Sequence, residues 1–140
     1  MKKFLFLMMV SMFAFAAVVA QEASTKKVNG PVITFEKKTH DFGDMVQGDK
    51  VEEVFKFTNT GNEPLIITNV EVTCGCTTPK GWQRDPIAPG AKSEIIVAFN
   101  STGKSGRQNK VVKVVSNAAN PEDANISFTA NVLDKKSTQP

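Results

Sequence analysis

The chain has 140 residues, of which 41% are hydrophobic and 22% charged, with a formal net charge of +3. This length suffices for one domain with a modest core, and two cysteines are too few for a disulfide-dense scaffold. Without the basic residues of the N-terminal segment discussed next, fifteen basic residues face fourteen acidic ones, so the charge gives no support for binding to nucleic acid or to a membrane surface.

Residues 1–20 have the pattern of a secretory signal peptide. Lys2 and Lys3 precede an apolar run over residues 4–19, and small residues lead up to Ala20. A membrane anchor is the alternative, since the run approaches the length that spans a bilayer. The abrupt change to polar QEASTKK favours cleavage after Ala20, so we expect an exported protein, periplasmic or extracellular.

The remaining chain divides into a leader, one domain and a tail. Residues 21–31 are polar and end in Gly30-Pro31, which indicates a flexible leader, and residues 134–140 form a polar tail. Between them, residues 32–133 contain no long segment with helical periodicity. They show short alternating segments separated by turn residues, which is typical of strands.

The predicted strands follow in chain order: residues 32–36, a strand entry at 40–43, and strands over 49–59, 65–76, 94–99, 110–116 and 125–132. In the entry, Phe42 is expected to pack inward, with Gly43 permitting positive φ or a close approach. In segment 65–76 the even positions from Ile66 to Cys76 are expected to form the apolar face, with both cysteines on it.

About seven short strands in about 100 residues predict an all-β fold, an immunoglobulin-like antiparallel β-sandwich. A small barrel is the alternative. The antibody hallmarks are absent, because the chain has no tyrosine and no Cys…Trp…Cys spacing.

Four short motifs in a fixed order add a family resemblance: HDFG at 40–43, FKFTNTG at 55–61, PLII at 64–67 and CGCT at 74–77. Together they resemble the bacterial domain-of-unknown-function family 1573, whose members look like Hydin-type and major-sperm-protein-type immunoglobulin modules. The resemblance covers roughly residues 33–132. It implies an immunoglobulin-like fold and an exported protein, and it brings no established activity.

Cys74 and Cys76 are the strongest candidates for chemistry, and three interpretations stay open. On a flat strand, residues two apart lie about 6.6 Å apart, whereas a disulfide needs β-carbons about 3.8 Å apart. An unbent strand would therefore leave two small buried hydrophobic residues. If Gly75 bends the chain, the pair can close a small disulfide, which an exported compartment favours and which can exchange thiols with a partner.

The third interpretation is a metal site. Two thiolates on one short segment suit a soft ion such as Cu(I) or Zn(II), with His40 or Met45 as a further ligand. The candidate metal ligands are thus Cys74, Cys76 and His40. A single histidine beside Asp41 is more often a hydrogen-bonded edge residue than a ligand, so the signal is weak.

Nothing in the chain resembles the machinery of a hydrolase or a thioredoxin-like enzyme. There is no serine elbow, no phosphate-binding glycine loop and only one histidine, and Cys-Gly-Cys has the wrong spacing for a redox helix. Trp82 is a candidate binding aromatic on a loop, or a lid over one end of the core. We therefore expect no enzyme.

The sequence favours an exported, non-catalytic immunoglobulin-like module for binding or scaffolding, with a protein partner met through exposed strand edges and no cofactor. The alternative is a periplasmic metal- or thiol-handling protein that uses the Cys-Gly-Cys motif. A redox enzyme ranks third.

Overall fold

The computed structural model describes residues 28–135. The expected signal peptide lies outside these residues, as do positions 21–27 of the expected leader and 136–140 of the expected tail. Within residues 28–135 the structure has no helix that is long and apolar enough to cross a membrane.

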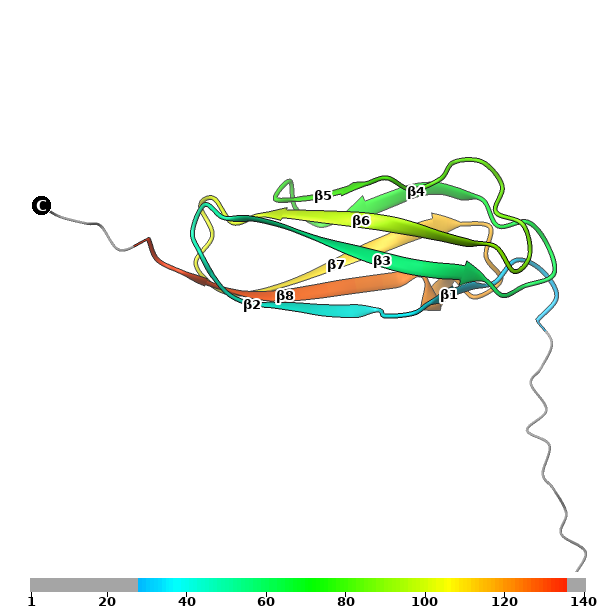
Figure 1. The fold of residues 1–140 in the computed structure, drawn as a ribbon, viewed down its shortest axis with the longest axis horizontal. Helices are drawn as coiled ribbons and strands as arrows, with labels where there is room; N and C mark the ends of the chain where they lie inside the picture. Colours follow the sequence, from blue (N-terminus) through cyan, green and yellow to red (C-terminus); the bar gives the residue numbers. More distant parts are fainter. Residues whose placement is uncertain (1–27, 136–140) are drawn as a thin grey trace, which may run out of the picture.

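Eight strands form two four-stranded sheets (Figure 1). One sheet has the order β1-β3-β6-β5 and the other has the order β2-β8-β7-β4. The strands are β1 (Ile33–Phe35), β2 (Thr39–Val46), β3 (Lys50–Asn59), β4 (Ile67–Val72), β5 (Thr77–Lys80), β6 (Lys92–Asn100), β7 (Gly106–Ser116) and β8 (Asn125–Leu133), with a short 3-10 turn at Pro121–Asp123 before β8.

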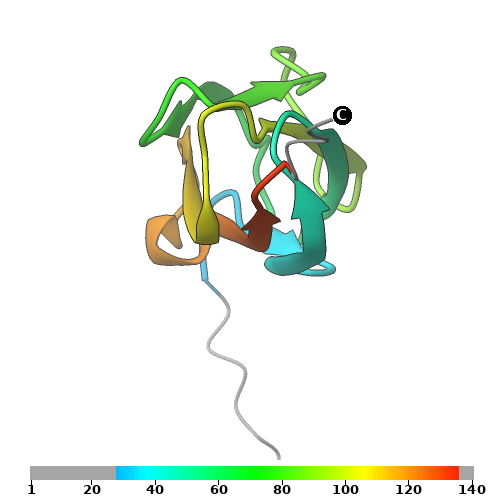
Figure 2. The same cartoon turned by 90° about the vertical axis from the view of Figure 1, so that its left-hand side faces the viewer.

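The core lies between the inner faces of the two sheets, which Figure 2 shows end on. Strict alternation on the central strands builds it: Phe55 and Phe57 point inward from β3, and Phe128 points inward from β8. Each fully buried aromatic or aliphatic side chain stabilises the fold by about 1.5–3 kcal/mol. The immunoglobulin-like sandwich predicted from the sequence is therefore the observed fold.

One pairing departs from the expected antiparallel arrangement. β1 pairs antiparallel with β3, but after Glu36–Lys38 the chain passes to the other sheet, where β2 runs parallel to β8. The predicted entry at residues 40–43 is thus part of an eight-residue edge strand. Phe42 packs against the core as expected. Gly43 has φ +67°, and a Cβ there would meet nothing within 4 Å, so positive φ explains this glycine.

The predicted strand over residues 65–76 is wrong in its length and in the face of its first residues, whereas Val70 and Val72 face the core as predicted. A register shift between Ile67 and Asn69 places Ile67 and Val70 in the core, while Ile66 is exposed. The strand ends at Val72. Residues 73–76 turn, and the unpredicted strand β5 then begins in the opposite sheet, so the cysteines lie in a turn and not on the inner face of a strand.

Candidate functional site at the β4–β5 edge

The turn between β4 and β5 carries a disulfide between Cys74 and Cys76. The two Cα atoms are 5.3 Å apart, closer than the roughly 6.6 Å of a flat strand, because the chain bends around Gly75. Both cysteines are half-buried and Gly75 is exposed. β4 and β5 are the outer strands of the two sheets on the same side of the sandwich, so the disulfide spans the corner where the chain changes sheets (Figure 1).

The hydroxyl of Thr77 faces both sulfurs. Its Oγ1 lies 3.6 Å from Cys74 Sγ and 3.8 Å from Cys76 Sγ. Sulfurs in a disulfide carry no proton, so the single hydroxyl proton of Thr77 is the only one available and the two contacts share it. Thr77 is only 4% exposed, and within the described part of the chain its side chain has no other hydrogen-bond partner.

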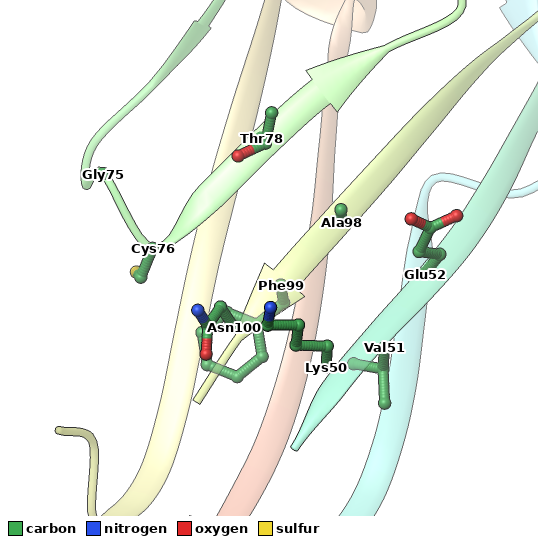
Figure 3. Close-up of a pocket in the computed structure, with 9 residues that line it drawn as sticks. All are labelled: Lys50, Val51, Glu52, Gly75, Cys76, Thr78, Ala98, Phe99 and Asn100. Carbon is green, nitrogen blue, oxygen red and sulfur yellow. The ribbon is translucent and has the colours of Figure 1, made fainter. Parts of the chain in front are cut away.

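A pocket of about 240 Å³ opens beside the disulfide and reaches Cys76 and Gly75. Figure 3 shows its wall, which combines the turn with residues from β3, β5 and the end of β6. Its polar lining comes mainly from Lys50, Glu52, Thr78 and Asn100, and the buried Phe99 also contributes to the lining. Asn100 N–H also donates to the Cys76 carbonyl oxygen at 2.9 Å, which ties the turn to β6.

The charges around this pocket do not cancel. Glu52 on β3 forms an ion pair with Lys80 on β5, and β6 lies between these two strands in the sheet. Lys50 is exposed and takes part in no ion pair among residues 28–135. The pocket beside Cys76 therefore has a net positive local charge, which attracts an anion.

The proposed metal set is not assembled. His40 lies on β2, three strand positions away from β4 in the same sheet, which corresponds to roughly 14 Å. Its Nδ1 is 3.1 Å from Lys37 Nζ and 3.5 Å from Glu53 Oε1, and its ring contacts Phe42. Met45 is buried in the core. In the described range, no group of three or more His, Cys, Asp or Glu side chains is placed to hold a metal ion.

Trp82, the candidate binding aromatic, follows β5 and is half-buried against the core. Its Nε1 is buried without a hydrogen-bond partner within residues 28–135, and the Arg84 guanidinium lies 5.3 Å from the ring centroid. The ring therefore covers part of the core, as a lid would, and only part of it faces solvent.

Two of the four edge strands are blocked at one position each. On β1, Asn120 Oδ1 accepts from Ile33 N–H at 3.1 Å and Asn120 Nδ2 donates to the Ile33 carbonyl oxygen at 2.9 Å, as a neighbouring strand would. On β5, the backbone of Cys76 bonds to β6, and hydrogen-bonding positions alternate along an antiparallel strand. The backbone of Pro79 therefore points toward the outer edge, where proline has no N–H to donate. Both devices protect a sheet edge from unwanted pairing.

The other two edges differ from each other. β2 is interrupted by a register shift between Asp41 and Asp44, which also place carboxylates along it. β4 pairs with β7, and Val114 N–H is used on the far side of β7, where it donates to Ala124. Val70 and Val72, opposite Val114 and Val112, therefore point their N–H and C=O groups away from β7, toward the free edge.

The start of this edge is already paired. Leu65 and Ile87 exchange two backbone hydrogen bonds, at 2.9 and 2.8 Å, in an isolated antiparallel bridge. No hydrogen bond within residues 28–135 uses the backbone of Val70 or Val72 on its outer side. The open part of the β4 edge thus runs from Val70 to Val72 and leads directly to the disulfide turn.

Sequence reasoning found the cysteines and missed the residues around them. Thr77, Lys50 and Asn100 gave no signal, because they approach the disulfide through strand pairing that no local pattern encodes. The open edge was missed for the same reason. Pro79 was the one visible clue, since proline within an alternating segment indicates an edge strand.

Two packed sheets of this topology, with an edge turn closed by a disulfide, define an immunoglobulin-like sandwich domain. The profile of a family described as "Protein of unknown function (DUF1573)" matches residues 33–132. The chain belongs to this family, as its motifs indicated.

Solved structures share the fold at low sequence identity. A protein of unknown function from Porphyromonas gingivalis W83 has a TM-score of 0.61 and 18% identity; the match covers 75% of this chain and 48% of that one. The seventh PapD-like domain of human CEP192 has a TM-score of 0.58 and 8% identity, covering 74% and 87%. The VesB protease of Vibrio cholerae has a TM-score of 0.53 and 14% identity, covering 74% and 32%.

These likenesses establish the fold alone. This chain spans about half the length of the P. gingivalis protein that it matches. No curated protein matches the sequence.

Proposed function

We propose that this chain is an exported, non-catalytic immunoglobulin-like module that binds an extended segment of a partner protein along the open edge of β4. The observation that carries the proposal is the outward direction of the Val70 and Val72 backbone groups. An exposed strand edge binds a polypeptide by adding it to the sheet as a further strand.

The contrast between the edges supports the choice of β4. Asn120 covers β1, Pro79 removes a donor from β5, and a bulge interrupts β2. An edge that is left open beside three protected ones is expected where pairing has a use, because an unprotected edge otherwise risks aggregation.

The two faces of β4 indicate what the partner strand looks like. Val70 is buried toward the core, while Glu71 is exposed opposite Lys113 on the outer face. An added strand continues both faces, so its residues should alternate between apolar and polar. The segment would pair over about three residues of β4 and end near the disulfide turn.

The test removes one donor of the edge without touching the β4–β7 ladder. In Val72→Pro the outward N–H is lost, and Val72→Ala is the matched control that loses a comparable side chain but keeps the N–H. A cooperative urea unfolding transition first establishes that wild type and both variants are folded. The three proteins are then immobilised and exposed to the exported protein fraction of the producing cells.

We expect wild type and Val72→Ala to retain the same partner protein in similar amounts. The amount retained by Val72→Pro should be at least tenfold lower. Equal retention by all three proteins, or loss with both variants, would contradict binding through the β4 backbone.

A further inference from the structure

We propose that the Cys74–Cys76 disulfide is a thiol-exchange site that accepts electrons from a dithiol polypeptide, with Cys76 as the attacked sulfur and Thr77 as the donor to the departing Cys74 thiolate. This role is independent of the β4 edge. It rests on the pocket, on its local charge and on the Thr77 hydroxyl.

The pocket decides which sulfur is attacked. A thiolate displaces one sulfur of a disulfide by approaching the other one. The pocket of about 240 Å³ is lined by Cys76 and Gly75 and not by Cys74. A Cβ built on Gly75 would meet nothing within 4 Å, so the bend of the turn is open on its outer side. A thiolate that enters this pocket meets Cys76 and not Cys74, so the proposal assigns Cys76 as the attacked residue and Cys74 as the leaving group.

Lys50 favours the arrival of the nucleophile. The attacking species is a thiolate anion. Lys50 lines the pocket beside Cys76, and the Glu52 carboxylate on the same wall is paired with Lys80. Figure 3 shows Lys50, Asn100 and Cys76 around the same opening, each from a different part of the chain.

Thr77 is placed to stabilise the departing sulfur. In the closed state its buried hydroxyl has only weak contacts with two neutral sulfurs, of which the one to Cys74 is the shorter, at 3.6 Å. When Cys74 leaves as a thiolate, the same hydroxyl donates to a full negative charge, and such a bond is much stronger than a neutral one. The hydrogen bond from Thr77 is therefore strongest after the disulfide has opened.

The exchange balances in two steps. The first polypeptide thiolate bonds to Cys76 Sγ, the Cys74–Cys76 bond breaks, and Cys74 takes the electron pair and then a proton. The second thiolate of the polypeptide then attacks the polypeptide's first sulfur, which is bonded to Cys76 in the mixed disulfide. The bond to Cys76 breaks, and Cys76 leaves as a thiolate. The polypeptide dithiol is oxidised to a disulfide, and the two cysteines of this chain are reduced, by two electrons in total. The transfer is stoichiometric.

The first step is tested with glutathione, a peptide monothiol, as the probe. Folded protein is mixed with excess glutathione, quenched in acid, alkylated and mapped by mass spectrometry. The result expected is a glutathione adduct on Cys76 with alkylated Cys74. An adduct mainly on Cys74, or a disulfide that reacts only after unfolding in urea, would overturn the proposal.

Matched variants separate the effect of the Thr77 hydroxyl from the effect of the side-chain volume. Thr77→Val keeps the volume and loses the donor, so the rate of opening should fall about threefold to tenfold. Thr77→Ser keeps the donor and should react within about twofold of wild type. Lys50→Met should slow the reaction and Lys50→Arg should restore it. Equal rates for Thr77→Val and Thr77→Ser would remove Thr77 from the proposal and overturn it as stated.

The Val72→Pro variant distinguishes this proposal from the function proposed above. It should lose the protein partner and still react with glutathione at the wild-type rate. A Val72→Pro protein that is folded but unreactive would contradict the independence of the two sites.

Discussion

The side chain of Asn59, at the end of β3, donates from Nδ2 to the Ile87 carbonyl oxygen at 2.8 Å, across the end of the sandwich that is opposite the β2–β3 and β6–β7 turns (Figure 1). Nδ2 also donates to the Glu63 carbonyl oxygen at 2.8 Å, and Oδ1 accepts from the N–H groups of Gly61 and Val32. Asn59 is fully buried, so one satisfied amide holds three connecting segments together.

Replacing Asn59 with Ala should therefore destabilise the domain severely. The substitution leaves buried backbone groups without partners, and we expect a loss of about 3 kcal/mol or more in the free energy of unfolding. Urea unfolding measures it. Asn131→Ala is the control: it also removes an amide hydrogen bond, to Asp44, but at the surface, and should cost less than about 0.5 kcal/mol. Similar losses in both variants would contradict the role assigned to Asn59.

Gly61 and Gly75 should respond in opposite ways to substitution by Ala. A Cβ on Gly61 would lie 2.1 Å from the Gly30 carbonyl oxygen, a backbone atom that cannot easily move, whereas a Cβ on Gly75 would meet nothing within 4 Å. We expect Gly61→Ala to lose about 3 kcal/mol or to fail to fold, and Gly75→Ala to stay within about 0.5 kcal/mol of wild type. Thermal unfolding of the two variants decides, and a tolerated Gly61→Ala would refute the close approach.

Removing the disulfide should cost little stability. Cys74 and Cys76 enclose a single residue, and a loop this short gives a stabilisation of about 1.5 kcal/mol in the chain-entropy model. The Cys74→Ser, Cys76→Ser double variant should therefore fold, with the urea midpoint of reduced wild type. A double variant that is unfolded would show that the disulfide holds the edge of the sandwich and not only its turn.

Stability should fall at low pH in part through Asp41. The Gly43 N–H bond to Asp41 Oδ1, at 3.0 Å, lowers the pKa of this carboxyl below its ordinary value of 3.8, with smaller contributions from the Thr129 side chain and the charges of Arg107 and His40. A lowered folded-state pKa gives stability that is present above the unfolded-state pKa and is lost as the pH falls through the folded-state pKa.

The measurement compares wild type with Asp41→Asn. The variant should be less stable at pH 7 and should approach wild type as the pH falls through the lowered folded-state pKa of Asp41, below which the carboxyl is protonated in both states. Because the leading cause is a hydrogen bond, the difference at pH 7 should persist in high salt, which screens only the charges. A difference that is constant across pH, or that vanishes with salt, would contradict this assignment.

The sequence predicted the central strands and could not predict how their edges are arranged. The alternation in residues 49–59 and 125–132 predicted strands correctly, because Phe55, Phe57 and Phe128 all face the single core between the two sheets. The alternation rule failed between Ile67 and Asn69, where one shifted residue reverses the faces of everything before it. The sequence did not decide whether the chain bends at Gly75, since glycine is compatible with both a bend and a strand.

The candidate site was predictable only at its cysteines. The short strand β5 is held by pairing with β6 and not by its own pattern, so the contacts of Thr77 and Lys50 with the disulfide region arise from tertiary structure. In the FKFTNTG motif, Gly61 is needed because the backbone at Gly30 passes too close for a side chain, a tertiary contact that the motif itself does not reveal.

The proposed function requires that the β4 edge is open and that a partner strand occupies it. Amide hydrogen exchange of Val70 and Val72, measured by NMR with and without the partner retained by the wild-type protein, tests it most directly. We expect fast exchange at both amides in the free protein, slow exchange at Asn69 and Glu71, which bond to β7, and slow exchange at all four amides in the complex. Slow exchange of Val70 and Val72 in the free protein, or unchanged fast exchange in the complex, would contradict it.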